Sequence, residues 1–304
     1  MTAVAATPKR VLRNRGEWRT VVVIVAVYAG WLAVVLGHRF LPWWATAALL
    51  AWFGAWHLSL LHELAHGRPF RQDRSNVLVG SLPVTLWIPF RSFRAVHLRH
   101  HDSELTDPID DPESFYTAGP AWAAAGPVRR AVLRANCTMA FRLLVWSALS
   151  VLAFVRDELR AAWRGAPGTR RAVGEHLAGV AVVVAVMTMS GIPWWLYLLG
   201  AVYGARMLNL VRSFAEHRWV PGDAPRTAMV EAGPVMSLLM LNVNLHVAHH
   251  AEPWVPWFDI PAVAARIDAA GQAASGAGRY RSGYLEVLRR YAFRPLDDPR
   301  YPGS

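Results

Sequence analysis

Long stretches without charged residues predict the first part of the fold. Residues 20–37 and residues 41–61 contain no Asp, Glu, Lys or Arg, and a short turn with Arg39 and Pro42 separates them. An α-helix needs about 20 apolar residues to cross the hydrocarbon core of a bilayer. We therefore expect both stretches to span a membrane as a hairpin, with the chain returning to its starting side near His62.

A second hairpin is predicted past the middle of the chain. Residues 176–205 carry no formal charge and are interrupted by Gly191 and Pro193. Glycine commonly follows the end of a helix, and proline commonly begins the next one. We expect helices over residues 174–190 and 193–213. Three aromatic residues at the turn between them are typical of a membrane interface: Trp194, Trp195 and Tyr197.

The segment between the hairpins has a mixed character. Residues 137–155 are apolar, but Arg142 interrupts them and five arginines follow: Arg156, Arg160, Arg164, Arg170 and Arg171. If this segment crossed the membrane, the bilayer would separate His217 from His62. We therefore expect an interfacial or re-entrant helix. Residues 77–90 are too short to cross and contain two prolines, so they too should lie on the membrane or dip into it.

The basic residues predict the orientation in the cell membrane. Residues 1–19 include Lys9, Arg10, Arg13, Arg15 and Arg19, and cytoplasmic segments beside spans are enriched in Lys and Arg. The basic stretch leads into the first span without a small-residue cleavage site, so we expect that span to be retained. Both termini should be cytoplasmic.

The expected fold is an all-α, multi-pass integral membrane protein with four spans in two hairpins, interfacial helices and a cytoplasmic histidine-rich cap. The composition becomes mixed after residue 258, and residues 280–293 predict an amphipathic helix. We divide the chain into a basic N-terminus (1–19), a membrane domain (20–258) and a C-terminal cap (259–304).

Composition favours the bilayer over a soluble fold. Hydrophobic residues make up 54% of the 304 positions and charged residues 17%, whereas charged residues make up roughly a quarter of a typical soluble domain. The net charge of +11 comes with no nucleic-acid motif, so a membrane surface is the better partner. Cys137 is the only cysteine, which excludes an internal disulfide and a thiolate metal cluster.

The histidines are the strongest chemical signal. Nine of the twelve fall in four places, within the sequences HELAH, HLRHH, EH and HVAHH: His62, His66, His97, His100, His101, His217, His246, His249 and His250. Residues three and four apart on a helix share a face, so each cluster can direct two or three imidazoles together. Adjacent histidines diverge by about 100° and can reach different ions.

The number of histidines indicates which metal fits. Imidazole ligands suit zinc, copper and iron, but a tetrahedral zinc site uses only three or four of them. Nine ligands exceed the capacity of one ion. Two ions of a redox metal that share the set, with open positions for O2, account for the number best.

These motifs resemble the three histidine boxes of the membrane fatty acid desaturase and hydroxylase family. The boxes HELAHG and HLRHH follow the first hairpin and HVAHH follows the second, and Glu216 with His217 resembles the additional ligand of that family. The resemblance covers roughly residues 57–261. It implies four spans and a non-haem diiron centre, held by the nine histidines, that uses O2 and two electrons to attack an unactivated C–H bond of a membrane lipid or acyl chain.

The chain departs from one branch of that family. Acyl-CoA desaturases similar to the animal enzymes carry an asparagine four residues before the additional histidine, and this position is Ser213 here. An asparagine-linked water ligand is not predicted at that position, although Asn209 and Asn242 lie nearby in the sequence. The Glu-His pair looks more like bacterial lipid desaturases, alkane hydroxylases and carotenoid ketolases.

Carboxylates beside the ligands are candidates to hold the second ring nitrogen of each imidazole. Four adjoin a histidine of the set: Glu63, Asp102, Glu216 and Glu252. The acidic run at residues 107–113 lacks calcium-loop spacing and is interpreted as a polar loop. Of two arginines near the end of the last span, we expect Arg206 to reach lipid headgroups and Arg212 to pair with Glu216.

No electron-carrier motif is visible in the sequence, because it has neither a thiolate set for an iron–sulfur cluster nor a flavin-binding glycine fingerprint. We expect electrons from a separate ferredoxin-type donor and its reductase.

Other functions stay open. A hydroxylase or ketolase of an acyl, alkane or terpenoid substrate would use the same centre. HELAH also fits HExxH, the motif of zinc proteases, with Glu63 as general base, but an intramembrane protease would leave six histidines unexplained. A non-enzymatic metal carrier or haem protein would need only histidine pairs within spans.

Overall fold

A computed structural model describes residues 17–222, 224–270 and 276–303. The expected basic segment before residue 17 lies outside the described residues. The first third contains five elements in chain order: α1 (Trp18–Gly37), the short 3-10 helix η1 (His38–Phe40), α2 (Trp43–Ala65), α3 (Asp73–Gly80) and α4 (Phe90–His101). The two stretches expected to form the first hairpin are therefore helices joined by a short turn.

The middle of the chain is helical as well. It contains α5 (Gly119–Ala123), α6 (Pro127–Asn136), α7 (Met139–Phe141), the π-helical η2 (Arg142–Trp146), α8 (Ser147–Trp163) and α9 (Thr169–Ser190). A second π-helical segment, η3 (Leu198–Gly204), joins α10 (Trp194–Tyr197) to α11 (Ala205–Ser213). We refer to the continuous stretch from Trp194 to Ser213 as α10–α11.

The C-terminal part has one feature that the all-α expectation did not include. It contains β1 (Met229–Val230), α12 (Pro234–Leu239), α13 (His246–Ala251), α14 (Ile260–Ala269), β2 (Arg279–Tyr280) and α15 (Gly283–Tyr291). The two strands pair in parallel, with Met229 opposite Arg279. Each strand has only two residues, too few for an alternating pattern to appear in the sequence.

Four helical stretches within the described residues are long and apolar enough to cross a membrane: Trp18–Phe40, Trp43–Ala65, Met139–Trp163 and Thr169–Ser190. Three of them match expected spans. The remaining one is the segment that we expected to lie in the interface, whereas α10–α11 is not among the four. The reason is compositional, because α10–α11 contains Arg206, Asn209 and Arg212 while Met139–Trp163 is more apolar at its centre.

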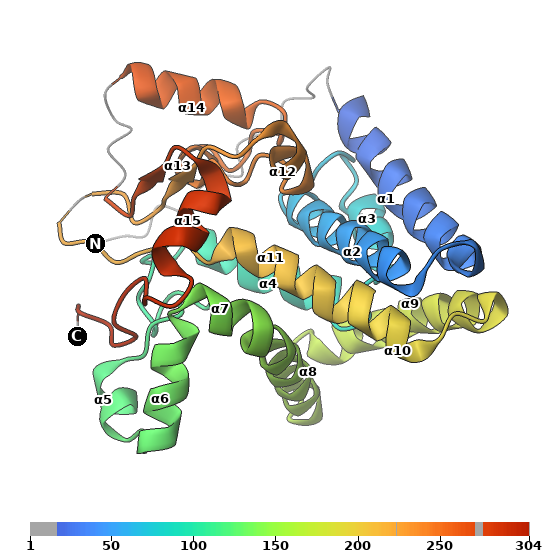
Figure 1. The fold of residues 1–304 in the computed structure, drawn as a ribbon, viewed down its shortest axis with the longest axis horizontal. Coiled ribbons are helices and arrows are strands. Elements are labelled where there is room, and N and C mark those ends of the chain that lie inside the picture. Colours follow the sequence, from blue (N-terminus) through green and yellow to red (C-terminus); the bar gives the residue numbers. More distant parts are fainter. Residues whose placement is uncertain (1–16, 223, 271–275, 304) are drawn as a thin grey trace.

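Packing nevertheless places α10–α11 along α2. A Cβ added at Gly200 would meet Leu50, one at Gly204 would meet Ala51, and one at Gly54 would meet Ala205, each at 2.6–2.7 Å. Small residues therefore let the two backbones approach closely, as they do between membrane helices. Figure 1 shows α2 and α10–α11 running side by side and α8 running crosswise to them.

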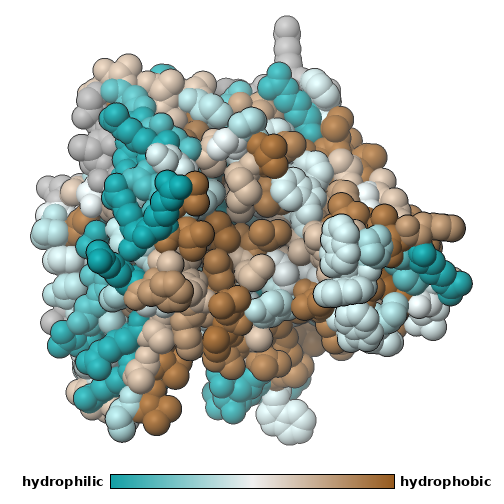
Figure 2. Space-filling model, viewed as in Figure 1, coloured by the Kyte–Doolittle hydropathy of each residue, from teal (hydrophilic) through white to brown (hydrophobic). Residues whose placement is uncertain are grey.

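The apolar surface lies where a bilayer would contact the helices. Val22, Val25 and Leu36 on α1 are 54–61% exposed, and Trp194 and Trp195 are 50% and 57% exposed. Figure 2 shows apolar residues over α8 and α11, and hydrophilic residues gathered on the side of α5, α6 and α15. Exposed apolar area of this extent marks a membrane-contacting surface.

Residues 81–86, within the apolar segment 77–90, lie among the helices. The carbonyl oxygen of Leu82 accepts a hydrogen bond from His57 on α2 (3.1 Å). Those of Leu86 and Val84 accept from His176 on α9 (3.0 Å) and Tyr197 on α10 (2.7 Å). Backbone groups away from water need such partners. Two of the three histidines outside the nine, His57 and His176, therefore support this loop.

Candidate metal centre

The first histidine pair lies at the end of α2. His62 belongs to its last turn, and His66 caps the helix, with its backbone N–H donating to the carbonyl of His62. The next residue, Gly67, has a φ of 80°, the left-handed conformation that commonly ends a helix. The helix therefore stops where both imidazoles point away from its axis towards α4.

The second cluster forms the last turn of α4. His97 and His101 are one turn apart, and their Nε2 atoms lie 3.2 Å from each other. His97 Nε2 also lies 3.0 Å from His66 Nε2. His100 points elsewhere, because it diverges from His101 around the helix, and its Nε2 lies 3.1 Å from that of His217.

The third cluster, on α13, divides in the same way. His249 Nε2 lies 3.1 Å from His101 Nε2, whereas His246 Nε2 lies 2.9 Å from His217 Nε2. His250 follows His246, with their Nε2 atoms 3.1 Å apart.

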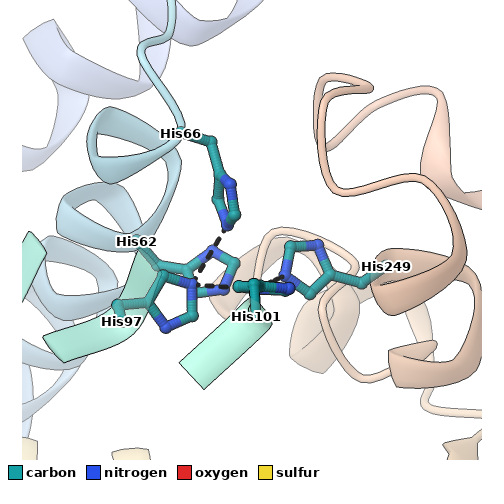
Figure 3. Close-up of side chains that lie close together, drawn as sticks. All are labelled: His62, His66, His97, His101 and His249. Atoms are coloured by element: carbon teal, nitrogen blue, oxygen red, sulfur yellow. Dashed lines mark hydrogen bonds between the residues drawn. The ribbon is translucent and has the colours of Figure 1, made fainter. Parts of the chain in front are cut away.

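The nine predicted histidines thus come together in two groups. The first group has five members, His62, His66, His97, His101 and His249, and the second has four, His100, His217, His246 and His250. Within each group the ligand atoms lie within 4.8 Å of one another. Figure 3 shows the rings of the five-histidine group directed towards a common space between α2, α4 and α13.

Acceptors behind the rings determine which nitrogen faces inward. His100 Nδ1 donates to Asp111 (2.7 Å) and His97 Nδ1 to Glu113 (3.2 Å). His246 Nδ1 donates to the carbonyl of Val243 (3.2 Å). With the proton held on Nδ1, the Nε2 lone pair is free for a metal ion.

The residues fit metal ions in two further respects. Both ring nitrogens of His62 are buried without a hydrogen-bond partner among the described residues, a costly state that a ligand would relieve. Burial lowers the pKa of His217 to about 3, and burial with neighbouring histidines lowers the pKa of His249 and His250 well below its ordinary value. These imidazoles are therefore neutral, the form that coordinates metals.

His100 behaves differently. Burial disfavours its charged form, but the hydrogen bond with Asp111 and nearby carboxylate charges outweigh burial and raise the pKa of His100. The same contacts lower the pKa of Asp111 despite its burial. Asp111 thus favours a positive charge at this imidazole, and a metal ion at Nε2 would provide one.

The four expected carboxylates occupy different surroundings. Glu216 lies 3.4 Å from His246 Nδ1 and pairs with Arg212 at 2.8 Å, which confirms the expected Arg212–Glu216 pair. Burial raises the pKa of Glu216 to about 7, although the charge of Arg212 opposes this rise. Among the four, Glu216 is the one with a histidine contact in the described structure.

The other three carboxylates have other surroundings in the described part of the chain. Glu63 accepts a hydrogen bond from the backbone N–H of Trp257 (3.2 Å), and Glu252 pairs with Arg266 (2.7 Å). Asp102 is exposed and caps α4. Adjacency in sequence misled this prediction, because neighbouring residues on a helix point in different directions.

Asp111 and Glu113 were missed because the acidic run was interpreted as a polar loop. Asp111 Oδ1 also accepts from the backbone N–H of Glu113 (2.8 Å) and its Oδ2 from that of Thr106 (2.9 Å), so the loop folds back onto α4. The available signal was their position about ten residues after the second box, a distance that a returning loop can span.

Comparisons with known proteins show the family to which the chain belongs. The fatty acid desaturase family model matches residues 38–283, a range that contains all nine histidines. The sphingolipid delta(4)-desaturase/C4-monooxygenase DES2 of Bos taurus is 27% identical over 255 residues, covering 80% of this chain and 71% of the relative. The DES2 of Homo sapiens is 25% identical over 260 residues, covering 82% and 73%.

The matches support desaturase or hydroxylase activity in a membrane protein. The family match spans well over half of the chain, and both relatives are aligned over most of their length. The chain belongs to the fatty acid desaturase family of oxidoreductase enzymes.

Proposed function

We propose that this protein is an O2-dependent membrane lipid desaturase that removes hydrogens from an unactivated acyl chain with a histidine-held pair of iron ions. The observation that carries the proposal is the division of nine histidines into neighbouring groups of five and four. All nine are the proposed ligands, because each contributes one ring nitrogen to one of the two groups.

Iron fits the donor set and the reaction better than zinc. Imidazole binds either metal, but zinc has no redox chemistry. A pair of iron ions would supply the oxidising power, drawn from O2, that cleaves an unactivated C–H bond. Desaturation removes two hydrogens from the chain, and two further electrons from an external donor complete the reduction of O2 to water.

The protein's own residues hold and orient the ligands. Asp111 and Glu113 keep the protons of His100 and His97 on Nδ1 and thereby direct Nε2 inward. His62, His97, His100, His246 and His249 are each no more than 3% exposed, so bulk water is kept from most of the ligand atoms. A dry site limits side reactions of an oxidising centre.

For the topology we propose four spans, α1, α2, α9 and α10–α11, with α8 in the interface and the histidine groups and both termini cytoplasmic. His100 on α4 lies beside His217 after α11, so the chain must cross an even number of times between them. Three helical stretches in that interval are long enough to cross, residues 139–163, α9 and α10–α11, and an even number of crossings allows two of them. The packing of α10–α11 along α2 supports α10–α11 as a crossing helix. The crosswise direction of α8 supports a place for α8 in the interface.

The division into residues 1–19, 20–258 and 259–304 belongs to the same proposal. The acyl substrate would be presented by a membrane lipid, in line with the sphingolipid named for both relatives. Electrons would come from a separate ferredoxin-type donor and its reductase. An excess of arginine gives the chain a net charge of +11, which favours an acidic donor protein.

A hydroxylase or ketolase is the second candidate, because the names of both relatives combine a desaturase with a monooxygenase. After the first hydrogen is removed, loss of a second hydrogen gives an alkene, and transfer of oxygen gives an alcohol. Mass spectrometry separates the two products, since one is lighter by two hydrogens and the other heavier by one oxygen.

The zinc protease has weaker support. Its general base would be Glu63, whose Oε1 instead accepts a hydrogen bond from Trp257. Glu63→Gln keeps this acceptor and should leave a desaturase active, while it would inactivate a protease. His250→Ala, outside the HELAH motif, should inactivate a desaturase and spare a protease.

The deciding experiment is expression with a compatible ferredoxin and reductase, followed by lipid profiling. We expect new unsaturated lipids with the unchanged protein and none with His249→Ala or His217→Ala expressed to the same level. Oxygenated products of unchanged unsaturation would favour the second candidate, and an unchanged lipid profile would contradict both.

A further inference from the structure

Arg206 is held by side chains of two helices on the element that leads to the candidate metal centre. It lies in α11 and is half-buried, with Nε donating to Ser150 Oγ of α8 (3.1 Å) and Nη1 to Asn209 Oδ1 (2.8 Å). Its guanidinium lies over the ring of Trp87, 5.5 Å from the centroid. The side chain is therefore turned into the contact between α8 and α11.

The charge of Arg206 is not balanced by an ion pair. No carboxylate lies within 4.0 Å of it in the part of the chain that the structure describes, whereas Arg212 on the same helix pairs with Glu216. Glu113 is close enough for its charge to act on Arg206, but Glu113 already accepts from His97. Arg142 and Arg212 add like charge to the surroundings. An unbalanced cation in an apolar setting favours an anion.

The surroundings combine polar donors with an apolar wall. A guanidinium has five N–H donors, and the two hydrogen bonds of Arg206 leave three for a further partner. Trp87 packs against Phe154 of α8, with ring centroids 5.2 Å apart. A lipid has the complementary composition, a polar group joined to an apolar chain.

The location also suits a substrate of the histidine groups. α11 leads within a few residues to His217, and Trp87 precedes α4, which carries His97 and His100. From Arg206 to the end of α11 is roughly 10 Å at the helical rise of 1.5 Å per residue. A lipid whose polar group is held at Arg206 would thus lie within reach of the site through its chain.

We propose that Arg206, together with Ser150 and Asn209, binds an anionic oxygen of the lipid substrate, a phosphate or a carboxylate, while Trp87 and Phe154 contact the adjoining chain. This deepens the proposed function and rests on it for the identity of the reaction. It makes Arg206 a determinant of which lipid class is accepted.

The test compares lipids that share one acyl chain and differ in the polar group: phosphatidylglycerol, the free fatty acid and diacylglycerol. Native mass spectrometry of the detergent-solubilised protein reports binding, and steady-state kinetics with the ferredoxin system report turnover. The variants are Arg206→Gln and Arg206→Lys. Arg160→Gln, on the exposed face of α8, is the matched control for loss of a surface charge.

We expect Arg206→Gln to weaken binding and raise the KM of an anionic lipid at least about tenfold, as for loss of a charge-assisted hydrogen bond. Arg206→Lys should recover part of this loss, kcat should stay within about twofold, and diacylglycerol should be unaffected. Preference for phosphatidylglycerol or for the fatty acid identifies the group as phosphate or carboxylate.

Equal losses for all three lipids, or a lowered melting temperature with unchanged lipid preference, would show a structural role and overturn the proposal. Unchanged binding in Arg206→Gln would do the same. The binding measurement does not require turnover. A protein that binds anionic lipids through Arg206 and converts none would contradict the proposed function. The proposed lipid binding by Arg206 would still hold.

Discussion

Asp111 holds His100 through a hydrogen bond between Oδ1 and Nδ1 of 2.7 Å, and both side chains are 1% exposed. Asp111 is itself fixed, because its carboxylate accepts two backbone N–H groups of its own loop. The orientation of His100 is thus set by a residue eleven positions further along the chain. Such partners raise the basicity of a ligand and determine which nitrogen it presents.

Asp111→Asn should lower metal occupancy and activity. The amide can present its NH2 group to Nδ1, which would place the imidazole proton on Nε2, the atom that faces the other ligands. Loss of such a partner typically lowers metal affinity or activity about 10–100-fold. Metal content measured against increasing chelator concentration checks this. Asp110→Asn, exposed and one residue away, should have no effect, and equal losses in both variants would contradict the specific role of Asp111.

Single ligand substitutions should distinguish the two groups. His66→Ala removes a member of the five-histidine group, and His217→Ala removes a member of the four-histidine group. Each should lower the ratio of tightly bound iron to protein by about one ion and abolish turnover, because the reaction needs both ions. His38→Ala, which lies outside both groups and bonds to Val35, is the control. A full iron complement in either ligand variant would contradict the proposed ligand sets.

The histidine groups could be predicted from the sequence because the signal is local. Spacings of three and four residues direct imidazoles to one face whatever the tertiary fold, and adjacent histidines diverge for the same reason. The partners of those imidazoles could not be predicted, since Asp111 acts through a loop whose return depends on backbone hydrogen bonds. The sequence neighbours Asp102 and Glu252 point elsewhere.

The membrane spans likewise could be predicted only where the signal is local in the sequence. Charge-free stretches identified α1, α2 and α9, because the energy of crossing depends mainly on composition. The role of residues 139–163 and of α10–α11 depends on packing instead. Close contacts of Gly200 and Gly204 with α2 are tertiary relationships that hydropathy alone does not contain.

Gly179→Ala should destabilise the protein. A Cβ at this position on α9 would lie 2.0 Å from the carbonyl oxygen of Ser81 and 2.7 Å from Pro83, so the inserted loop would have to move. Overpacking of this kind costs about 1–3 kcal/mol or more. Gly174→Ala on the same helix meets nothing within 4 Å and should be neutral or stabilise by up to about 1 kcal/mol. Thermal unfolding in detergent compares them, and equal melting temperatures would contradict the close packing.

The Arg212–Glu216 pair should be more costly to break than to replace. Their side chains are 13% and 7% exposed, so Arg212→Met leaves a carboxyl group buried without its partner. Breaking a buried pair typically costs about 3–5 kcal/mol, whereas replacing both members by apolar residues is often close to neutral. The double variant Arg212→Met with Glu216→Met should therefore be more stable than Arg212→Met alone. Additive losses in the double-mutant cycle would show that the pair is not coupled.

Removal of metal should lower the melting temperature. Without ions, ring nitrogens only 2.9–3.2 Å apart face one another in a buried space, and binding to the folded state adds about 2.7 kcal/mol at a free metal concentration of 100 times Kd. Chelation followed by addition of Fe(II) should restore both stability and turnover. Addition of Zn(II) should restore stability alone, and turnover with zinc would contradict a redox role.

The spread of the ligands along the chain determines when the centre can be completed during biosynthesis. Both groups take members from α4 and α13, so the five-histidine group lacks His249 and the four-histidine group lacks His246 and His250 until translation has passed residue 250. The first hairpin and α4 must therefore fold in the membrane before any ion has its full set of ligands. With the proposed pair of iron ions, insertion of the metal would be complete only after α13 has been made, and a chain that ends before α13 would lack three of the nine proposed ligands.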